Sequence, residues 1–170
     1  AASDVYKRQI FRRDATTLLV GDRCRFEPTE PGCGSITAIE PRKNTLQRPP
    51  VANLDRLAMV VSLADPAPNA LVIDQLTAIA ARRDIPVVMI FTKPDLADPT
   101  PCVDIYRRAG YPTAVVNNRT GEGLTEAAAL LKGGITAFCG NSGAGKSSLM
   151  NGLYPDLNLA TGEISKKLGR

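Results

Sequence analysis

The sequence predicts an α/β fold, with a mostly parallel sheet covered by helices, preceded by part of a small β-barrel. Three observations support this prediction. From residue 51 onward, short apolar segments alternate with segments of helical spacing, which is typical of parallel α/β units. A glycine-rich stretch then stands between an apolar segment and a helical one. Before residue 51, short segments of alternating polarity are separated by glycine and proline turns.

Composition excludes several classes of chemistry. The chain has 170 residues, a net charge of +4 and no His, so it cannot contain a His-based triad. The four cysteines form no C-x-x-C pair and are interpreted as free thiols, not as a zinc site. Because no apolar run approaches the length of a membrane span and no signal-peptide pattern is present, we expect a cytoplasmic protein without a membrane partner.

Short strands are expected in the first part of the chain at 16–20, 23–27 and 34–40, with a turn-rich segment at 28–34. Leu46 to Pro50 ends in two prolines and predicts a linker between domains at 1–47 and 51–170. Basic residues gather in this part and indicate either an RNA-facing surface or an ordinary solvated face: Arg12, Arg13, Arg23, Arg25, Arg42, Lys43 and Arg48. Residues 1–9 show no periodicity and are left out of the fold prediction.

Four strands and four helices are expected in the second part. The strands are predicted at 57–63, 85–91, 113–116 and 135–139, and the helices at 69–83, 102–109, 122–132 and 147–153. Asn69 is a candidate cap for the first helix, while Gly110 and Gly133 follow the second and third as stop signals. Helical spacing in the first helix is carried by Leu71, Val72, Leu76, Ile79 and Ala80.

The glycine-rich stretch fits G-x-x-x-x-G-K-[ST], the phosphate-binding loop, in the required strand–loop–helix context. Glycines let backbone N–H groups turn inward around an anion, and the helix N-terminus adds unpaired donors. Lys146 would reach the β- and γ-phosphates, and the Ser147 hydroxyl would bind Mg²⁺, which makes these two the predicted catalytic residues. The alternative is a glycine-rich turn without a ligand. The predicted phosphate-binding residues are Gly140, Asn141, Ser142, Gly143, Ala144, Gly145, Lys146, Ser147 and Ser148.

Two further segments follow predicted strands. Thr92-Lys93-Pro94-Asp95 offers a carboxylate that can accept both the N1–H and the N2 amine of guanine, which adenine cannot present. The stem of Lys93 could lie over the base. Asn117 and Asn118 begin a loop that could place a backbone N–H against the guanine O6. Taken alone, each segment is a weak signal, and an ordinary turn or capped loop is the better explanation. Because all three motifs follow strands of one parallel sheet, they could converge on one ligand.

These segments resemble known motifs. TKPD is similar to the guanine-specifying [NT]-K-x-D motif of GTPases, NNRTGEG to the S-A-K-type loop that follows it, and GNSGAGKS to the GTPase phosphate loop. Asn117-Asn118 stands where Ser-Ala is common. The base motifs precede the phosphate loop, as in circularly permuted GTPases. Together with VGDRCRFE and PRKNTLQRPPVANLDRLAMVVS, the motif order resembles the ribosome small subunit-dependent GTPase A family from about Phe11 onward.

The resemblance implies an oligonucleotide-binding-type (OB) barrel followed by a circularly permuted GTPase domain. It also implies GTP or GDP with Mg²⁺ as ligands, GTP hydrolysis in late maturation of the small (30S) ribosomal subunit, contact with that subunit and its rRNA, and a monomer. Zn²⁺ is expected only in a C-terminal domain of the parent protein. We expect the chain to be a fragment that stops before both switch motifs, binds GDP weakly and hydrolyses GTP poorly. Two alternatives stay open: an ATP-specific P-loop NTPase, and an RNA-binding OB module with a vestigial nucleotide site.

Overall fold

A computed structural model describes residues 17–30 and 33–159. The chain divides into two compact units, Ala1–Asn53 and Leu54–Arg170. Several predictions lie outside the described residues: those for 1–9, for Arg12, Arg13 and Thr16, and for the end of the chain after residue 159.

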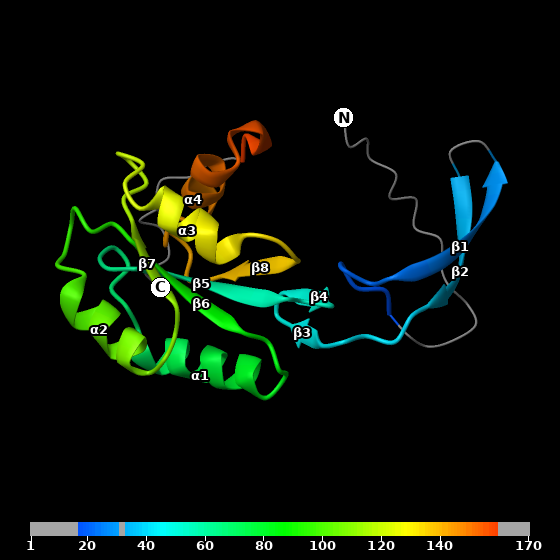
Figure 1. Ribbon diagram of the computed structural model, residues 1–170, viewed down its shortest axis with the longest axis horizontal. Helices are drawn as coiled ribbons and strands as arrows, with labels where there is room; N and C mark the ends of the chain where they lie inside the picture. The colour runs from blue at the N-terminus through cyan, green and yellow to red at the C-terminus, as the bar shows by residue number, and fades with distance from the viewer. Residues whose placement is uncertain (1–16, 31–32, 160–170) are drawn as a thin grey trace, which may run out of the picture. The chain divides into compact units, whose positions relative to one another are not determined.

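The second unit contains a four-stranded parallel sheet in the order β7-β6-β5-β8 (Figure 1). The strands are β5 (Arg56–Ser62), β6 (Val87–Thr92), β7 (Thr113–Val116) and β8 (Thr136–Cys139). β5 and β6 lie in the middle and are buried almost throughout, which explains their continuous apolar sequences. The predicted parallel sheet is therefore confirmed, with each strand within two residues of its expected bounds at either end.

Helices cover both faces of this sheet. α1 (Ala70–Ala81) and α2 (Thr100–Arg108) lie on one face, and α3 (Leu124–Leu131) and α4 (Lys146–Leu153) on the other (Figure 1). A short 3₁₀ turn, η1 (Pro155–Leu157), follows α4. The core under α3 and α4 brings together residues of β5, β6, β7, the two helices and the phosphate loop, and includes Ala58, Ile90, Val116, Ala127, Ala144 and Leu149.

Helix boundaries follow local hydrogen bonds. Asn69 caps α1 as predicted, because its Oδ1 accepts from Val72 N at 3.2 Å. α2 begins at Thr100, two residues early, where Asp98 Oδ1 accepts from Thr100 N at 2.9 Å. α3 begins at Leu124 and not at Glu122, because Asn117 N donates to Glu122 O at 2.9 Å and keeps Glu122 in the loop.

The apolar spacing of α1 predicts the helix but not its buried face. Ile73, Thr77 and Ala80 are buried. Leu71 and Ile79 are 67% and 47% exposed. Since α1 carries apolar residues on several sides, spacing alone cannot select the side that contacts the sheet.

The described residues of the first unit form two hairpins. β1 (Cys24–Glu30) pairs antiparallel with β2 (Cys33–Ile39), and β3 (Thr45–Gln47) with β4 (Pro50–Ala52). The predicted linker at 46–50 is wrong, because Leu46 pairs with Val51 and is itself buried. The turn expected from residue 28 is also wrong: β1 continues through Pro28, which sits beside a register shift where a missing N–H is tolerated. Of the strand expected at 16–20, the described part forms only a bridge from Val20 to Val51.

A bidentate ion pair joins the segment before β1 to the segment after β2. Arg42 Nε donates to Asp22 Oδ1 at 2.6 Å, and Arg42 Nη2 donates to Asp22 Oδ2 at 2.8 Å. The Asp22 side chain is 2% exposed. The hydrogen bond from Arg42 holds the pKa of Asp22 below its ordinary value. Arg42 is therefore part of the internal structure of this unit, although the sequence places it in a candidate RNA-facing group.

No helix within residues 17–30 and 33–159 is long and apolar enough to cross a membrane.

Candidate nucleotide-binding site

Strand register brings the three predicted motifs to one edge of the sheet. Ser62 of β5 pairs with Thr92 of β6, and Thr92 pairs with Val116 of β7, so these three strands end level. β8 ends earlier, at Cys139 opposite Met59 of β5. The loop after β8 therefore begins below the level of its neighbours and turns over the end of β5. The predicted convergence of the motif segments on one sheet edge is confirmed.

Close backbone contact shapes the start of the phosphate loop. A Cβ added to Gly140, whose φ is +145°, would lie 2.2 Å from the carbonyl oxygen of Val60. Only glycine can therefore occupy this position without moving β5. Ala144 is 1% exposed and belongs to the same core cluster as Leu149 of α4. The phosphate loop is thus anchored in the protein interior at both ends.

The start of α4 completes the loop. Gly145 takes the N-cap position with φ +84°, and its carbonyl accepts from Leu149 N at 2.9 Å. The N–H groups of the first turn of a helix have no intrahelical acceptor, which suits an anion. Lys146 Nζ donates to Gly140 O at 2.8 Å and to Asn141 O at 2.7 Å. The ammonium group is thereby held against the loop by carbonyls that a phosphate oxygen could replace.

Ser147 is the protein ligand that this loop could offer to Mg²⁺. Mg²⁺ in nucleotide sites takes few protein ligands and is held mainly by phosphates and water. One hydroxyl beside a phosphate loop fits that requirement. Among the described residues, no group of three His, Cys, Asp or Glu side chains could hold a metal. The zinc prediction concerns another domain of the parent protein and stays a prediction.

The segment from Thr92 to Asp95 forms both a turn and part of the site. Leu96 N donates to Lys93 O at 3.1 Å, as in an ordinary turn. Thr92 is fully buried, and its hydroxyl donates to Ala144 O in the phosphate loop at 2.7 Å. Lys93 has φ +62°, and its Nζ donates to Asp65 O in the loop after β5. The turn interpretation and the site interpretation are therefore compatible.

Asp95 carries a partner that sequence reasoning missed. Arg119 Nη1 lies 3.2 Å from Asp95 Oδ2, with side chains 79% and 26% exposed. The two residues come from different loops, and no local pattern indicates the pair. A guanidinium at this position balances the charge of the carboxylate that we predict to accept from guanine.

The two predicted asparagines differ in what they contact. Asn117 Oδ1 accepts from Arg119 N at 2.9 Å and from Thr120 N at 3.4 Å, so Asn117 shapes its own loop. Asn118 Nδ2 instead donates to Gly145 O at 3.2 Å. From the sequence we predict that both residues lie beside the base. The contacts of their side chains shown here are within the protein, so a contact with the base stays a prediction.

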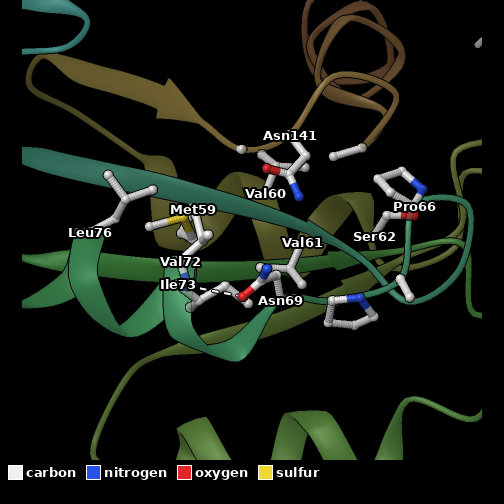
Figure 2. A pocket seen from close by; sticks show the side chains of 14 residues that line it. Met59, Val60, Val61, Ser62, Pro66, Asn69, Val72, Ile73, Leu76 and Asn141 are labelled. Carbon is white, nitrogen blue, oxygen red and sulfur yellow. Dashed lines mark hydrogen bonds between the residues drawn. The ribbon is translucent and has the colours of Figure 1, made fainter. Parts of the chain in front are cut away.

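A small cavity borders the phosphate loop on the α1 side (Figure 2). It has a volume of about 20 Å³ and is lined by β5 and α1 side chains together with Asn141. A space of this size holds about one water molecule. The cavity is therefore too small to hold a nucleotide.

Burial raises the pKa of the Cys139 thiol to about 11, against a smaller lowering effect of Lys146. Cys139 directly precedes the phosphate loop, and its thiol lies 3.4 Å from Met59 Sδ. The thiol therefore stays protonated at neutral pH and adds no negative charge beside the proposed phosphates.

Comparison with known families agrees with this geometry. The profile described as RsgA GTPase matches residues 39–170. The chain belongs to the RsgA GTPase family. The family resemblance seen in the sequence is thereby confirmed.

Curated RsgA relatives match nearly the whole chain. The protein from Moorella thermoacetica, named small ribosomal subunit biogenesis GTPase RsgA, is 40% identical over 162 residues, which is 94% of this chain and 56% of that protein. A relative of the same name from Geobacillus kaustophilus is 39% identical over 169 residues, or 96% of this chain and 58% of that protein. The chain thus spans just over half the length of these RsgA relatives.

Solved structures of RsgA-like proteins confirm the fold. The crystal structure of YjeQ from Thermotoga maritima matches with a TM-score of 0.76 and 36% identity, covering 91% of this chain and 58% of that one. The structure of YloQ, described as a circularly permuted GTPase, matches with a TM-score of 0.68 and 30% identity, covering 88% and 54%. The α/β fold with its permuted motif order is therefore that of the RsgA family.

Proposed function

We propose that this chain binds guanine nucleotide with Mg²⁺, and that the whole protein hydrolyses GTP during maturation of the small ribosomal subunit. The carrying observation is that the segments predicted to read the base bond directly to the phosphate loop, through Thr92 to Ala144 and Asn118 to Gly145. Two separate turns without a common ligand would not require these contacts. The family and the names of its curated relatives support the same function.

Each part of the site has a proposed role. The backbone N–H groups from Gly140 to Ser148 surround the phosphates, and Lys146 places a positive charge on the β- and γ-phosphates. Ser147 holds Mg²⁺, which bridges phosphate oxygens and supplies charge neutralisation in phosphoryl transfer. Asp95 accepts from guanine, and the stem of Lys93 covers the base.

Selectivity would come from Asp95. A carboxylate built to accept two donors loses both partners when adenine replaces guanine. Unpaired acceptors in a partly buried site are costly, so GTP should be preferred to ATP. An ATP-specific NTPase is the competing interpretation, and it requires that Asp95 contact no base.

The proposed partners are the small ribosomal subunit and its rRNA, as the names of the relatives indicate. Hydrolysis is proposed for the whole protein because groups that hold the γ-phosphate and position the attacking water are needed in addition to a phosphate loop. For this chain, the proposal is nucleotide binding with slow hydrolysis. A monomeric state and a cytoplasmic location stay predictions.

Titration of a fluorescent GDP analogue with Mg²⁺, followed by competition with GTP and ATP, tests the proposal. We expect GTP but not ATP to displace the probe, and Lys146→Ala to abolish binding. Lys132→Ala, which removes an exposed lysine after α3, is the matched control and should bind normally. Equal displacement by ATP and GTP would favour the ATPase interpretation, and absence of binding by a folded sample would contradict the proposal.

A further inference from the structure

Two side chains from outside the phosphate loop bond to consecutive carbonyls within it. Thr92 Oγ1 donates to Ala144 O at 2.7 Å, and Asn118 Nδ2 donates to Gly145 O at 3.2 Å. Thr92 ends β6 and Asn118 follows β7, so the donors come from two different strand ends. The two carbonyls lie immediately before Lys146. A movement of either donor would therefore shift the backbone at the junction between the phosphate loop and helix α4.

The fit between Asn118 and Gly145 is tight. A Cβ added to Gly145 would lie 2.7 Å from Asn118 Nδ2 and 3.7 Å from Thr92 Oγ1. The glycine thus gives room for the amide as well as allowing φ +84°. Gly145 O also accepts from Leu149 N at 2.9 Å, which is the first hydrogen bond of α4. Asn118 therefore acts on the carbonyl that orients the start of this helix.

The orientation of the Asn118 amide has a single determinant among the described residues. Its Oδ1 is buried and has no hydrogen-bond partner, whereas its Nδ2 bonds to Gly145 O. Because only the –NH₂ group can donate to a carbonyl, the contact with Gly145 sets which way the amide points. The side chain of Asn117, one residue earlier, accepts only from N–H groups of its own loop in the described contacts.

We propose that the Asn118 side chain is a positioning group for the phosphate loop and does not itself read the base. With Thr92, it fixes the backbone just before Lys146 and so holds the loop's N–H groups in the shape that phosphate requires. This inference rests on the proposed nucleotide-binding function. It separates two roles that the sequence assigned to one loop: Asn117 shapes the loop beside the base, and Asn118 acts on the phosphates.

The test compares ligands that contain only phosphate with ligands that also contain a base. Affinities of the 170-residue chain for a fluorescent GDP analogue are measured with Mg²⁺, and pyrophosphate, GTP and ATP are used as competitors. We expect Asn118→Ala to lower the affinity for the GDP analogue and the affinity for pyrophosphate alike, by about three- to tenfold, which is the effect of one lost hydrogen bond. The ratio of GTP to ATP affinity should stay that of the wild type.

Asn118→Asp and Thr92→Val make the test independent of one substitution. Asn118→Asp keeps the side-chain shape but cannot donate when ionised, and it places negative charge beside the phosphates. It should lower the affinity for pyrophosphate more than Asn118→Ala does. Thr92→Val removes the other donor and should also lower the affinity for pyrophosphate. Gln75→Ala, which removes an exposed amide on α1, is the matched control, and thermal unfolding of each variant verifies folding.

Two results would overturn the inference. One is unchanged pyrophosphate affinity in Asn118→Asp. The other is loss of the GTP preference with pyrophosphate affinity intact, which would place Asn118 at the base. If the wild-type chain binds neither guanine nucleotide nor pyrophosphate, the proposed function itself fails, and the inference fails with it.

Discussion

We propose that Asp95, whose Oδ2 lies 3.2 Å from Arg119 Nη1, sets the base preference of the site. Asp95→Asn should lower the affinities for GTP and GDP by roughly 10- to 100-fold, because a hydrogen bond to a charged group contributes about 1.5–3 kcal/mol. Phosphate contacts should persist, so pyrophosphate affinity should be unchanged. The measurement is competition against the fluorescent GDP analogue.

Asp98→Asn is the matched control for this substitution. Asp98 lies three residues further on, and its carboxylate accepts from Thr100 N at the start of α2. That hydrogen bond lowers the pKa of Asp98 below its ordinary value. We expect Asp98→Asn to retain the wild-type preference for GTP. Unchanged GTP and GDP affinity in Asp95→Asn would show that the TKPD segment is not the base site.

Alanine substitutions at two glycines with similar φ angles separate the effect of backbone strain from the effect of a steric contact. Gly145 has φ +84° with Asn118 Nδ2 2.7 Å from an added Cβ, while Gly110 has φ +89° with nothing within 4 Å. Gly145→Ala should reduce nucleotide affinity by more than about tenfold, because the loop must move away from Asn118. Gly110→Ala should lower stability by about 1 kcal/mol with normal binding. Similar binding by both variants would contradict the contact argument.

At the scale of elements, the Asp22–Arg42 ion pair joins the segments that flank the β1–β2 hairpin, and we expect it to stabilise the first unit. The pKa of Asp22 is lowered in the folded chain, chiefly by the hydrogen bond from Arg42. The stability that this carboxylate supplies is therefore fully present above the ordinary pKa of Asp, about 3.9, and is lost as pH falls through the lowered value.

Acid titration checks this prediction. Urea unfolding of the first unit, followed by NMR signals from β1 to β4, should show that the stability of the wild type falls as the pH drops below the ordinary pKa of Asp, about 3.9. Asp22→Asn should lower stability at pH 7 by about 1–3 kcal/mol and make it less dependent on pH in this range. Asp104→Asn, on the exposed side of α2, is the control and should retain the wild-type acid profile. A wild-type stability that does not change in acid would contradict the argument.

Element identities follow from local pattern, as the second unit shows. Continuous apolar sequences predicted β5 and β6, and Asn69 predicted the start of α1. The pattern failed where pairing decides the outcome. Leu46 to Pro50 is a poor strand by composition, but it forms part of a hairpin in which Leu46 pairs with Val51, and both Leu46 and Ala52 are buried.

At the scale of the whole molecule, every residue of the proposed site lies in the second unit, Leu54–Arg170. A chain of residues 54–170 should therefore bind the GDP analogue with an affinity within about twofold of the full chain. The chain of residues 54–170 is best compared with a chain that lacks only residues 1–46. That shorter deletion removes most of β3 and leaves the buried Ala52 of β4 without its partner strand. A loss of nucleotide binding in 54–170 would show that the first unit contributes to the site.

The RNA interpretation of the first unit is also testable at this scale. Arg42 is paired with Asp22, and Arg25 Nε lies 3.6 Å from Glu40 Oε1. Part of the positive charge of the candidate RNA-facing residues is therefore neutralised within the chain. We expect binding to small ribosomal subunits, measured by co-sedimentation, to decrease on removal of residues 1–53 and to persist in Lys146→Ala. Equal binding by 54–170 and the full chain would place the ribosome contact in the nucleotide-binding unit.

The sequence by itself determined the order of strands and helices in the second unit and predicted the phosphate loop and the base motif, because periodicity and turn chemistry act over a few neighbouring residues. Only the tertiary structure decided that Arg119 pairs with Asp95, that Asn118 bonds to Gly145, and that Arg42 pairs with Asp22. It also decided which side of α1 is buried. These contacts join residues that are far apart in the chain. They depend on which strands are neighbours and in what register, and neither is specified by any local pattern.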